Sequence, residues 1–137
     1  MKTLTIASIV FFMTIRLVAQ NFELTSPNDK LQATLTISDR ISFSVKLKGE
    51  TVVESAVIAM EMGAGRTLGY NAQVKDHTIK AFDQEIQPQL PFKDARIKAS
   101  YQQLILNFEG EYQLHFRAYN DGFAYRFVDE DNNPTHV

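Results

Sequence analysis

The strongest constraint on the fold is an alternation of apolar and polar residues, interrupted by a turn signal every eight to twelve residues. A period of two is typical of β-strands with one buried face, and no stretch sustains the 3.6-residue period of a helix. Residues 30–38 show the alternation most clearly, and residues 41–47 repeat it after a turn at residues 38–40. The face that we expect these two strands to bury consists of Leu31, Ala33, Leu35, Ile37, Ile41, Phe43, Val45 and Leu47. The pattern predicts an all-β, antiparallel sandwich.

The middle of the chain gives weaker signals. Residues 51–62 predict a short strand that ends at the polar residues Glu54 and Ser55, followed by a second apolar run. Pro88 and Pro91 exclude regular strand structure across residues 87–92, because proline cannot donate a hydrogen bond to a strand ladder. The other segments predicted as strands are residues 74–86, 95–101 and 104–108.

Residues 112–128 predict a hairpin with Asn120, Asp121 and Gly122 as its loop. A type I turn followed by a left-handed glycine forms a three-residue loop with a bulge. Such a loop places Arg117 opposite Tyr125 and gives Gly122 a positive φ. The same register pairs Tyr119 with Phe123, His115 with Phe127, Phe116 with Arg126, and Ala118 with Ala124. Each face then carries aromatic side chains and one arginine, which is typical of a sheet covered on both sides.

Three segments of this sequence resemble a known family. They are LTSPNDKLQATL (residues 24–35), GETVVES (residues 49–55) and FRAYNDGFAYRF (residues 116–127). Over about residues 22–128 the chain is similar to the N-terminal domain of family 97 glycoside hydrolases. The resemblance implies a β-super-sandwich of the galactose-mutarotase-like kind. Because DEDNNPTHV (residues 129–137) follows without further strands, we expect this sandwich to be incomplete at its C-terminus.

The resemblance also implies a parent enzyme, a periplasmic α-glucosidase or α-galactosidase with a catalytic (β/α)8 barrel. A calcium ion near the active site is expected in that full-length parent. The family's catalytic carboxylates lie mostly in the barrel, which would begin well beyond residue 137, so none is assigned to this chain. The sequence does not distinguish glucoside from galactoside specificity.

The N-terminus predicts export. Lys2 precedes an apolar run over residues 4–15, too short to span a bilayer well, and Ala19 is a suitable small residue for signal-peptidase cleavage. We therefore expect a signal peptide at residues 1–19 and a periplasmic domain at residues 20–137 without a stable membrane anchor. An uncleaved anchor and a buried core segment are the rival interpretations. The chain has no cysteine, which excludes a lipoprotein anchor, disulfides and thiolate chemistry.

The remaining residues give no chemical motif. A net charge of −2 with scattered lysines and arginines does not suit nucleic acid. Glycoside hydrolysis needs two carboxyl groups held across the scissile bond, and pairs such as Glu109 with Glu111 or Asp129 with Glu130 read as solvated loop charges. The dispersed histidines His77, His115 and His136 form no metal motif. No catalytic, cofactor-binding or metal-binding residue is predicted.

Arg117, Tyr125 and Arg126 are the candidate contacts with a sugar or with the catalytic barrel. Arginine suits interfaces because its guanidinium pairs with carboxylates and stacks on aromatic rings. In the alternative interpretation each arginine stacks on its cross-strand partner inside the sandwich, Arg117 on Tyr125 and Arg126 on Phe116. The four tyrosines that could form a sugar platform are divided between two faces: Tyr101, Tyr112, Tyr119 and Tyr125.

Together these features predict an accessory domain that supports the catalytic barrel of a glycosidase. Its partners would be that barrel and an oligosaccharide. The alternatives are a free-standing carbohydrate-binding module and a non-functional gene fragment. We expect the chain alone to be inactive on α-glycosides, and to be poorly stable or self-associating because strand edges would be uncovered.

Overall fold

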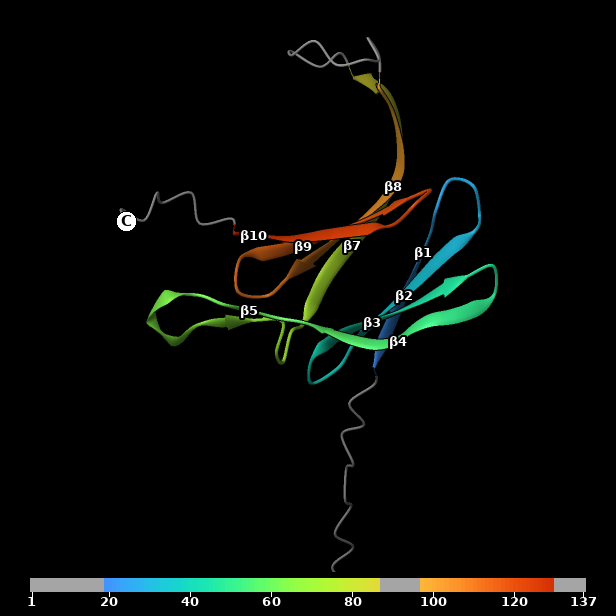
Figure 1. Cartoon of the computed structure of the whole chain (residues 1–137). Coiled ribbons are helices and arrows are strands. Elements are labelled where there is room, and N and C mark those ends of the chain that lie inside the picture. Colours follow the sequence, from blue (N-terminus) through green and yellow to red (C-terminus); the bar gives the residue numbers. More distant parts are fainter. Residues whose placement is uncertain (1–18, 87–96, 130–137) are drawn as a thin grey trace, which may run out of the picture.

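The computed structural model describes residues 19–86 and 97–129, and this part of the chain contains no α-helix. Two four-stranded antiparallel sheets, ordered β1-β2-β3-β4 and β10-β9-β8-β7, face each other, and a short hairpin of β5 and β6 extends beside them (Figure 1). The strands are β1 (Gln20–Thr25), β2 (Leu31–Ile37), β3 (Ile41–Leu47), β4 (Glu50–Ile58), β5 (Met60–Glu61), β6 (Thr67–Leu68), β7 (Val74–Ile86), β8 (Ile97–Phe108), β9 (Tyr112–Tyr119) and β10 (Phe123–Asp129). The predicted all-β sandwich is confirmed.

Strands β2 and β3 form where the alternation predicts, but the expected burial is wrong for part of β3, since Phe43 is half-buried and Leu47 is 41% exposed. Leu31, Ala33, Leu35 and Ile37 are all buried, and the residues between them are half-buried. The β3–β4 turn uses Lys48 at φ 50° and Gly49 at φ 87°. Glycine reaches such a left-handed conformation without a steric penalty, so the sequence marks the turn correctly.

The middle segment differs from its prediction. Strand β4 runs without a break across the polar step that was expected to end a short strand. Its polar residues are tolerated because β4 is an edge strand and most of it is exposed. After β4, a 3₁₀ turn at Gly63–Gly65 joins β5 to β6.

Strand β8 corrects a second prediction. The two strands expected at residues 95–101 and 104–108 are one strand, Ile97–Phe108, which pairs along its whole length with β7. Residues 101–108 of β8 also pair with β9 on the other side, so the break expected between Tyr101 and Leu104 lies in the middle of a sheet. The distal part of the β7–β8 hairpin projects beyond the sandwich (Figure 1). Residues 87–92, for which no regular strand was predicted, lie outside the described residues.

The register of the β9–β10 hairpin is the main correction. Tyr125 pairs with Phe116 and Ala124 with Arg117, one position away from the predicted pairs. The Tyr119 N–H donates to the Gly122 carbonyl over 2.8 Å, so the turn is centred on Asn120 and Asp121 alone. Gly122 does not have a positive φ. The predicted bulge is therefore absent.

Packing between the sheets explains this register. In the observed pairing Phe123, Tyr125 and Phe127 of β10 lie on the same face as the buried residues of β9. The centroid of the Phe116 ring lies 5.6 Å from that of Phe123 and 6.2 Å from that of Tyr125. The predicted register would have turned those three aromatic residues toward the polar face of β9, and a one-residue slip has this effect on every side chain.

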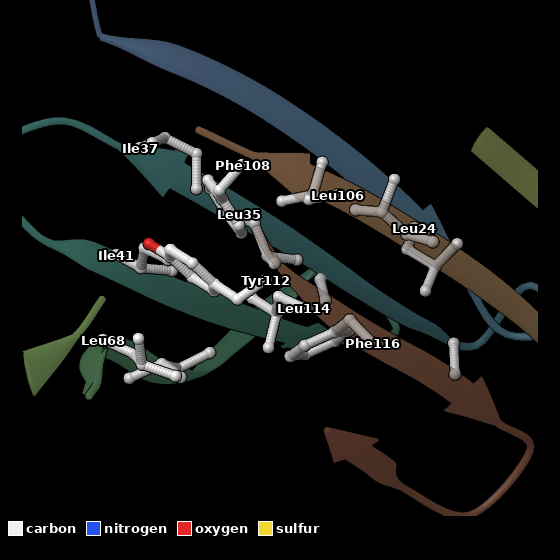
Figure 2. Packing of buried hydrophobic residues seen from close by; sticks show 14 residues of the cluster. Leu24, Leu35, Ile37, Ile41, Leu68, Leu106, Phe108, Tyr112, Leu114 and Phe116 are labelled. Atoms are coloured by element: carbon white, nitrogen blue, oxygen red, sulfur yellow. The ribbon is translucent and has the colours of Figure 1, made fainter. Parts of the chain in front are cut away.

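The core lies between β1–β2–β3 and β8–β9. Leu24, Leu35 and Ile41 from one sheet meet Leu106, Leu114 and Phe116 from the other (Figure 2). Tyr112 and Leu68 close the end of the cluster near β6, as Figure 2 shows. The largest buried side chains of the described residues are thus apolar, as a sandwich of alternating strands requires.

A polar contact joins the two sheets at the β1–β2 loop. The Asn28 N–H donates to the Asn120 Oδ1 over 2.9 Å, and the Asn28 Nδ2 donates to the Asn120 carbonyl over 3.4 Å. Ser26 supports the loop from within, since its hydroxyl accepts from the Leu31 N–H and donates to the Asn28 Oδ1. We call this the Asn28–Asn120 clasp.

The predicted signal peptide at residues 1–19 lies almost wholly outside the described residues. Within residues 19–86 and 97–129 there is no helix of the length and apolarity that crossing a membrane would require.

Candidate interdomain face

The β7–β10 sheet has an outer face that points away from the core, and the two candidate arginines share it. Arg117 and His115 of β9 lie beside Arg126 of β10 and opposite Gln103 of β8. Tyr125 lies on the inner face instead, where its ring is 6.2 Å from those of Phe43 and Phe116. The expectation of one arginine on each face, with Phe116 opposite Arg126, is therefore wrong. We define the outer face by Tyr101, Gln103, His115, Arg117, Tyr119 and Arg126.

Arg117 is the best-fixed side chain of the outer face. Its Nε donates to the Gln103 Oε1 over 2.7 Å, and its guanidinium carbon lies 4.8 Å from the centre of the Tyr101 ring. Gln103 is only 4% exposed, so this bond provides a partner for a buried amide oxygen. Arg117 does stack on an aromatic ring, as the alternative interpretation expected. The ring belongs to Tyr101 of the neighbouring strand β8, so the expected stacking on Tyr125 is wrong.

An aromatic row crosses the same face. The rings of Phe82 and Tyr101 are stacked with centroids 4.9 Å apart, and Tyr101 is 5.1 Å from Tyr119. The four tyrosines are divided between two faces, as predicted, but Tyr125 joins Tyr112 on the inner face instead of sharing a face with Tyr119. The outer face thus presents two neighbouring tyrosines, each half-buried.

His115 separates the two arginines and is held as a neutral ring. Burial is the main cause that lowers its pKa below the ordinary 6.5, and the charges of Arg126 and Arg117 lower the pKa further. Its Nε2 lies 2.8 Å from the Gln113 Oε1, and the Arg126 Nη2 lies 3.4 Å from its Nδ1. These partners assign the proton to Nε2, because only an unprotonated Nδ1 can accept from Arg126.

The outer face is suited to contact and not to hydrolysis. The three candidate residues Arg117, Tyr125 and Arg126 line one hollow together with His115, Tyr119 and Ala124, but its volume of about 100 Å³ is well below the roughly 300–1,000 Å³ of small-molecule sites. The residues that define the face include two arginines and no carboxylate, whereas glycoside hydrolysis requires two carboxyl groups. A cationic, aromatic surface with a fixed arginine matches the core of a protein interface.

The described residues offer no ligand set for the calcium ion that the resemblance implies for a full-length enzyme. In residues 19–86 and 97–129, no three His, Asp or Glu side chains lie close enough together to hold a metal ion. We therefore assign no calcium ligand to this part of the chain.

Sequence reasoning missed Tyr101 and Gln103 as members of the face. Their period of two in residues 101–108 was visible, but the strand was read as broken before Leu104. The partner of Arg117 was sought in the hairpin, while it comes from the neighbouring strand β8.

Comparisons with known proteins found a similar sequence and similar folds. A retaining alpha-galactosidase of Bacteroides thetaiotaomicron is 34% identical over 138 residues, which cover 100% of this chain and 21% of that protein. A glycoside hydrolase family 97 enzyme from Pseudoalteromonas sp. strain K8, solved with panose, superposes with a TM-score of 0.67 at 13% identity. It covers 77% of this chain and 17% of the solved chain. A beta-arabinopyranosidase superposes with a TM-score of 0.70 at 22% identity over 80% of this chain and 18% of the solved one.

These matches differ in what they establish. The two solved structures show the fold alone, since both are under 25% identical. The chain spans about a fifth of the length of the curated relative. The family model that describes the N-terminal domain of glycosyl hydrolase 97 matches residues 24–137, which is most of the chain. The chain therefore belongs to the glycosyl-hydrolase 97 N-terminal domain family.

Proposed function

We propose that this chain acts as the accessory N-terminal domain of a periplasmic family 97 α-glycosidase that degrades oligosaccharides. The outer face of the β7–β10 sheet would contact the catalytic barrel, and the barrel would supply the catalytic acid and base groups. The 34% identity to a retaining alpha-galactosidase supports the α-glycosidase assignment. The signal-like residues 1–19 support export.

The observation that carries the proposal is the fixed state of Arg117. A guanidinium held by Gln103 and Tyr101 has lost side-chain freedom before any partner arrives. Preorganised side chains reduce the entropic cost of association, which is a property of interface anchors. Arg126 lies beside it and is exposed, so the pair presents positive charge to an acidic partner surface.

A chimera tests this role. In the Bacteroides alpha-galactosidase, the 138-residue segment that matches this chain would be replaced by this chain. We expect the chimera to hydrolyse a nitrophenyl α-galactoside. We also expect Arg126→Glu to lower its activity at least about tenfold, because an interface tuned to a cation then meets a like charge. The same substitution in the chain alone should change the free energy of unfolding by less than about 0.5 kcal/mol, as exposed sites usually do.

Lys46→Glu is the matched control, since Lys46 is also exposed but belongs to β3 of the other sheet. Equal activity of the Arg126→Glu and Lys46→Glu chimeras would contradict the interdomain role of the outer face.

The chain alone provides a second test. We expect no release of nitrophenol from α-glucosides or α-galactosides in calcium buffer, because glycoside hydrolysis needs two carboxyl groups held across the scissile bond and the family's pair is expected in the barrel. We also expect sedimentation at micromolar concentration to reveal self-association. The basis is the exposed edge strand β4, on which Val52 is 55% and Val57 45% exposed. Clear turnover would overturn the accessory role, and a monodisperse monomer would contradict the self-association.

A further inference from the structure

A second concave region lies beside the β5–β6 hairpin and shares no residue with the outer face. Its walls are the β5–β6 hairpin, the segment after β6, the β8–β9 turn and the end of β10. Its volume of about 620 Å³ lies within the roughly 300–1,000 Å³ range of small-molecule sites. We call it the Arg66 cleft.

The base of the Arg66 cleft is preorganised by Arg66. The Arg66 Nη2 donates to the Gly110 carbonyl over 2.8 Å, and its Nη1 lies 3.4 Å from the Asp129 Oδ2. One guanidinium thus joins the β5–β6 hairpin to the β8–β9 turn and to β10. This bridge fixes Arg66 relative to Asp129, which is 63 residues away in sequence, and relative to Gly110, which is 44 residues away.

Tyr112 forms the inner wall. It is 6% exposed and its ring stacks on Phe108 with centroids 4.8 Å apart. The pKa of Tyr112 is raised above its ordinary value, mainly by burial. A hydrogen bond from the Gly69 backbone and the charge of Arg66 lower the pKa, but by less. The hydroxyl therefore stays protonated at neutral pH.

The segment that carries Tyr70 is anchored on both sides. The Gly69 carbonyl accepts from the Ile41 N–H over 2.9 Å, and the Asn71 N–H donates to the Asp39 carbonyl over 2.8 Å. Between these bonds Tyr70 lines the cleft and is 49% exposed. An aromatic ring on an anchored backbone, open to solvent beside polar groups, is suited to stacking against the apolar face of a ligand ring.

The Arg66 cleft carries charges of both signs, with one more carboxylate than cations. Arg66 and Lys75 contribute two cations, and Glu109, Glu111 and Asp129 contribute three carboxylates. Among the described residues, Lys75, Glu109 and Glu111 form no ion pair, so these groups are open to a ligand. The three carboxylates would repel an anionic ligand, and Arg66 and Lys75 would repel a cationic one. A ligand rich in hydroxyl groups can donate to the carboxylates and accept from the cations at once.

We propose that the Arg66 cleft binds a neutral, polyhydroxylated ring compound of the sugar class. Tyr70 would stack on the ring, and Arg66, Lys75 and Glu111 would hydrogen-bond its hydroxyl groups. The proposal does not rest on the interdomain role of the outer face, because the two surfaces have no residue in common.

The test is a titration of the isotopically labelled full chain, followed by the backbone amide signals in two-dimensional NMR. Maltotriose and raffinose are the neutral probes, with inorganic sulfate and calcium chloride as separate charged probes. We expect a neutral probe to shift the amides of Asn71, Gly110 and Glu111 with a dissociation constant of about 1 mM, which is typical of a small, shallow contact. No shift with either sugar at about 20 mM, or shifts with sulfate or calcium alone, would overturn the proposal.

Variants separate stacking from a general effect on the fold. We expect Tyr70→Ala to weaken sugar binding at least about tenfold, because truncating an exposed aromatic anchor removes its stacking area. Tyr70→Phe should retain affinity within about threefold, which also excludes a loss of folding as the cause. Tyr125→Ala is the matched control, since Tyr125 is likewise 49% exposed but lies outside the cleft. Equal weakening by Tyr70→Ala and Tyr125→Ala would overturn the assignment.

The two proposals fail separately. Tyr70→Ala in the alpha-galactosidase chimera should leave barrel assembly unchanged, whereas Arg126→Glu should leave the sugar titration of the chain alone unchanged. Loss of sugar binding with Arg126→Glu would show that the ligand occupies the outer face and would overturn the cleft assignment.

Discussion

Alternate residues of β9 belong to two surfaces that are held in different ways. On the inner face Tyr112, Leu114, Phe116 and Ala118 are at most 6% exposed and pack against apolar neighbours. On the outer face Gln113, His115, Arg117 and Tyr119 are half-buried, and directional polar or ring contacts fix them. Burial therefore decides how β9 pairs with its neighbours, while the polar contacts decide what the strand presents to a partner.

The largest effect should follow from a cavity on the inner face. Phe116 is fully buried, and its ring lies 5.5 Å from Phe43 and 5.6 Å from Phe123. Phe116→Ala should lower the free energy of unfolding by about 3–5 kcal/mol, a large part of the roughly 5–15 kcal/mol of a domain. Urea unfolding followed by circular dichroism measures this change. A loss below about 1 kcal/mol would mean that Phe116 is not part of the packed core.

A smaller loss is expected on the outer face when Arg117 is replaced. Arg117→Met removes the donor to Gln103, a residue only 4% exposed, and an unsatisfied buried acceptor costs about 1–3 kcal/mol. Arg126→Met, at an exposed site on the same face, should change the unfolding free energy by less than about 0.5 kcal/mol.

The double variant Arg117→Met with Gln103→Leu makes the comparison sharper. Replacing both partners with apolar groups should recover much of the loss, because no buried polar atom is left without a partner. Additive losses in this double-mutant cycle would show that the Arg117–Gln103 bond does not stabilise the outer face.

His115 should make stability weakly dependent on pH. Its pKa in the folded chain is below the ordinary 6.5, so the unfolded chain binds the proton first as the pH falls. The stabilisation is fully present above about pH 6.5 and is lost as the pH falls toward the lower folded pKa. Urea unfolding at pH 7.5 and pH 5.5 should show a smaller difference for His115→Asn than for the unchanged chain. Equal differences would mean that His115 does not contribute.

The smallest effect is expected at Gly122. A Cβ added there meets no atom within 4 Å, and φ lies outside the left-handed range. Gly122→Ala should therefore change the unfolding free energy by less than about 0.5 kcal/mol. Gly69→Ala is the contrast, because at φ 92° its Cβ would lie 2.3 Å from the Ile58 carbonyl oxygen. A loss of about 1 kcal/mol or more at Gly122 would favour the three-residue loop with a left-handed glycine.

The sequence predicted those parts of the fold in which the local signals agree. The β2–β3 hairpin was correct because alternation and turn residues agree over residues 31–47. The β9–β10 register was wrong because the Asn-Asp-Gly signal favoured a bulge, while the aromatic residues of β10 required the inner face. The packing of these aromatic residues on the inner face, where Phe123 and Phe127 are partly buried and Tyr125 stays 49% exposed, outweighed the local turn preference.

The two candidate surfaces could be predicted only in part. Arg117 and Arg126 were identified because both stand in a strongly patterned hairpin. Their common face depends on the register, so it could not be assigned correctly. The Arg66 cleft combines residues from positions 66–75, 109–112 and 129, and the sequence has no short-range signal that brings such segments together.

The Asn28–Asn120 clasp has a consequence for the order in which the chain acquires its structure. Its two residues are 92 positions apart, one in each of two segments that carry the family resemblance. At the usual 5–20 residues per second, a ribosome makes Asn120 about 5–18 seconds after Asn28. During that interval β1–β3 can pair locally, but the sheet that covers them is incomplete and their apolar face stays open to other chains. Closure of the clasp joins the β1–β2 loop to the β9–β10 hairpin, so the domain needs protection from aggregation at least until that hairpin has been made.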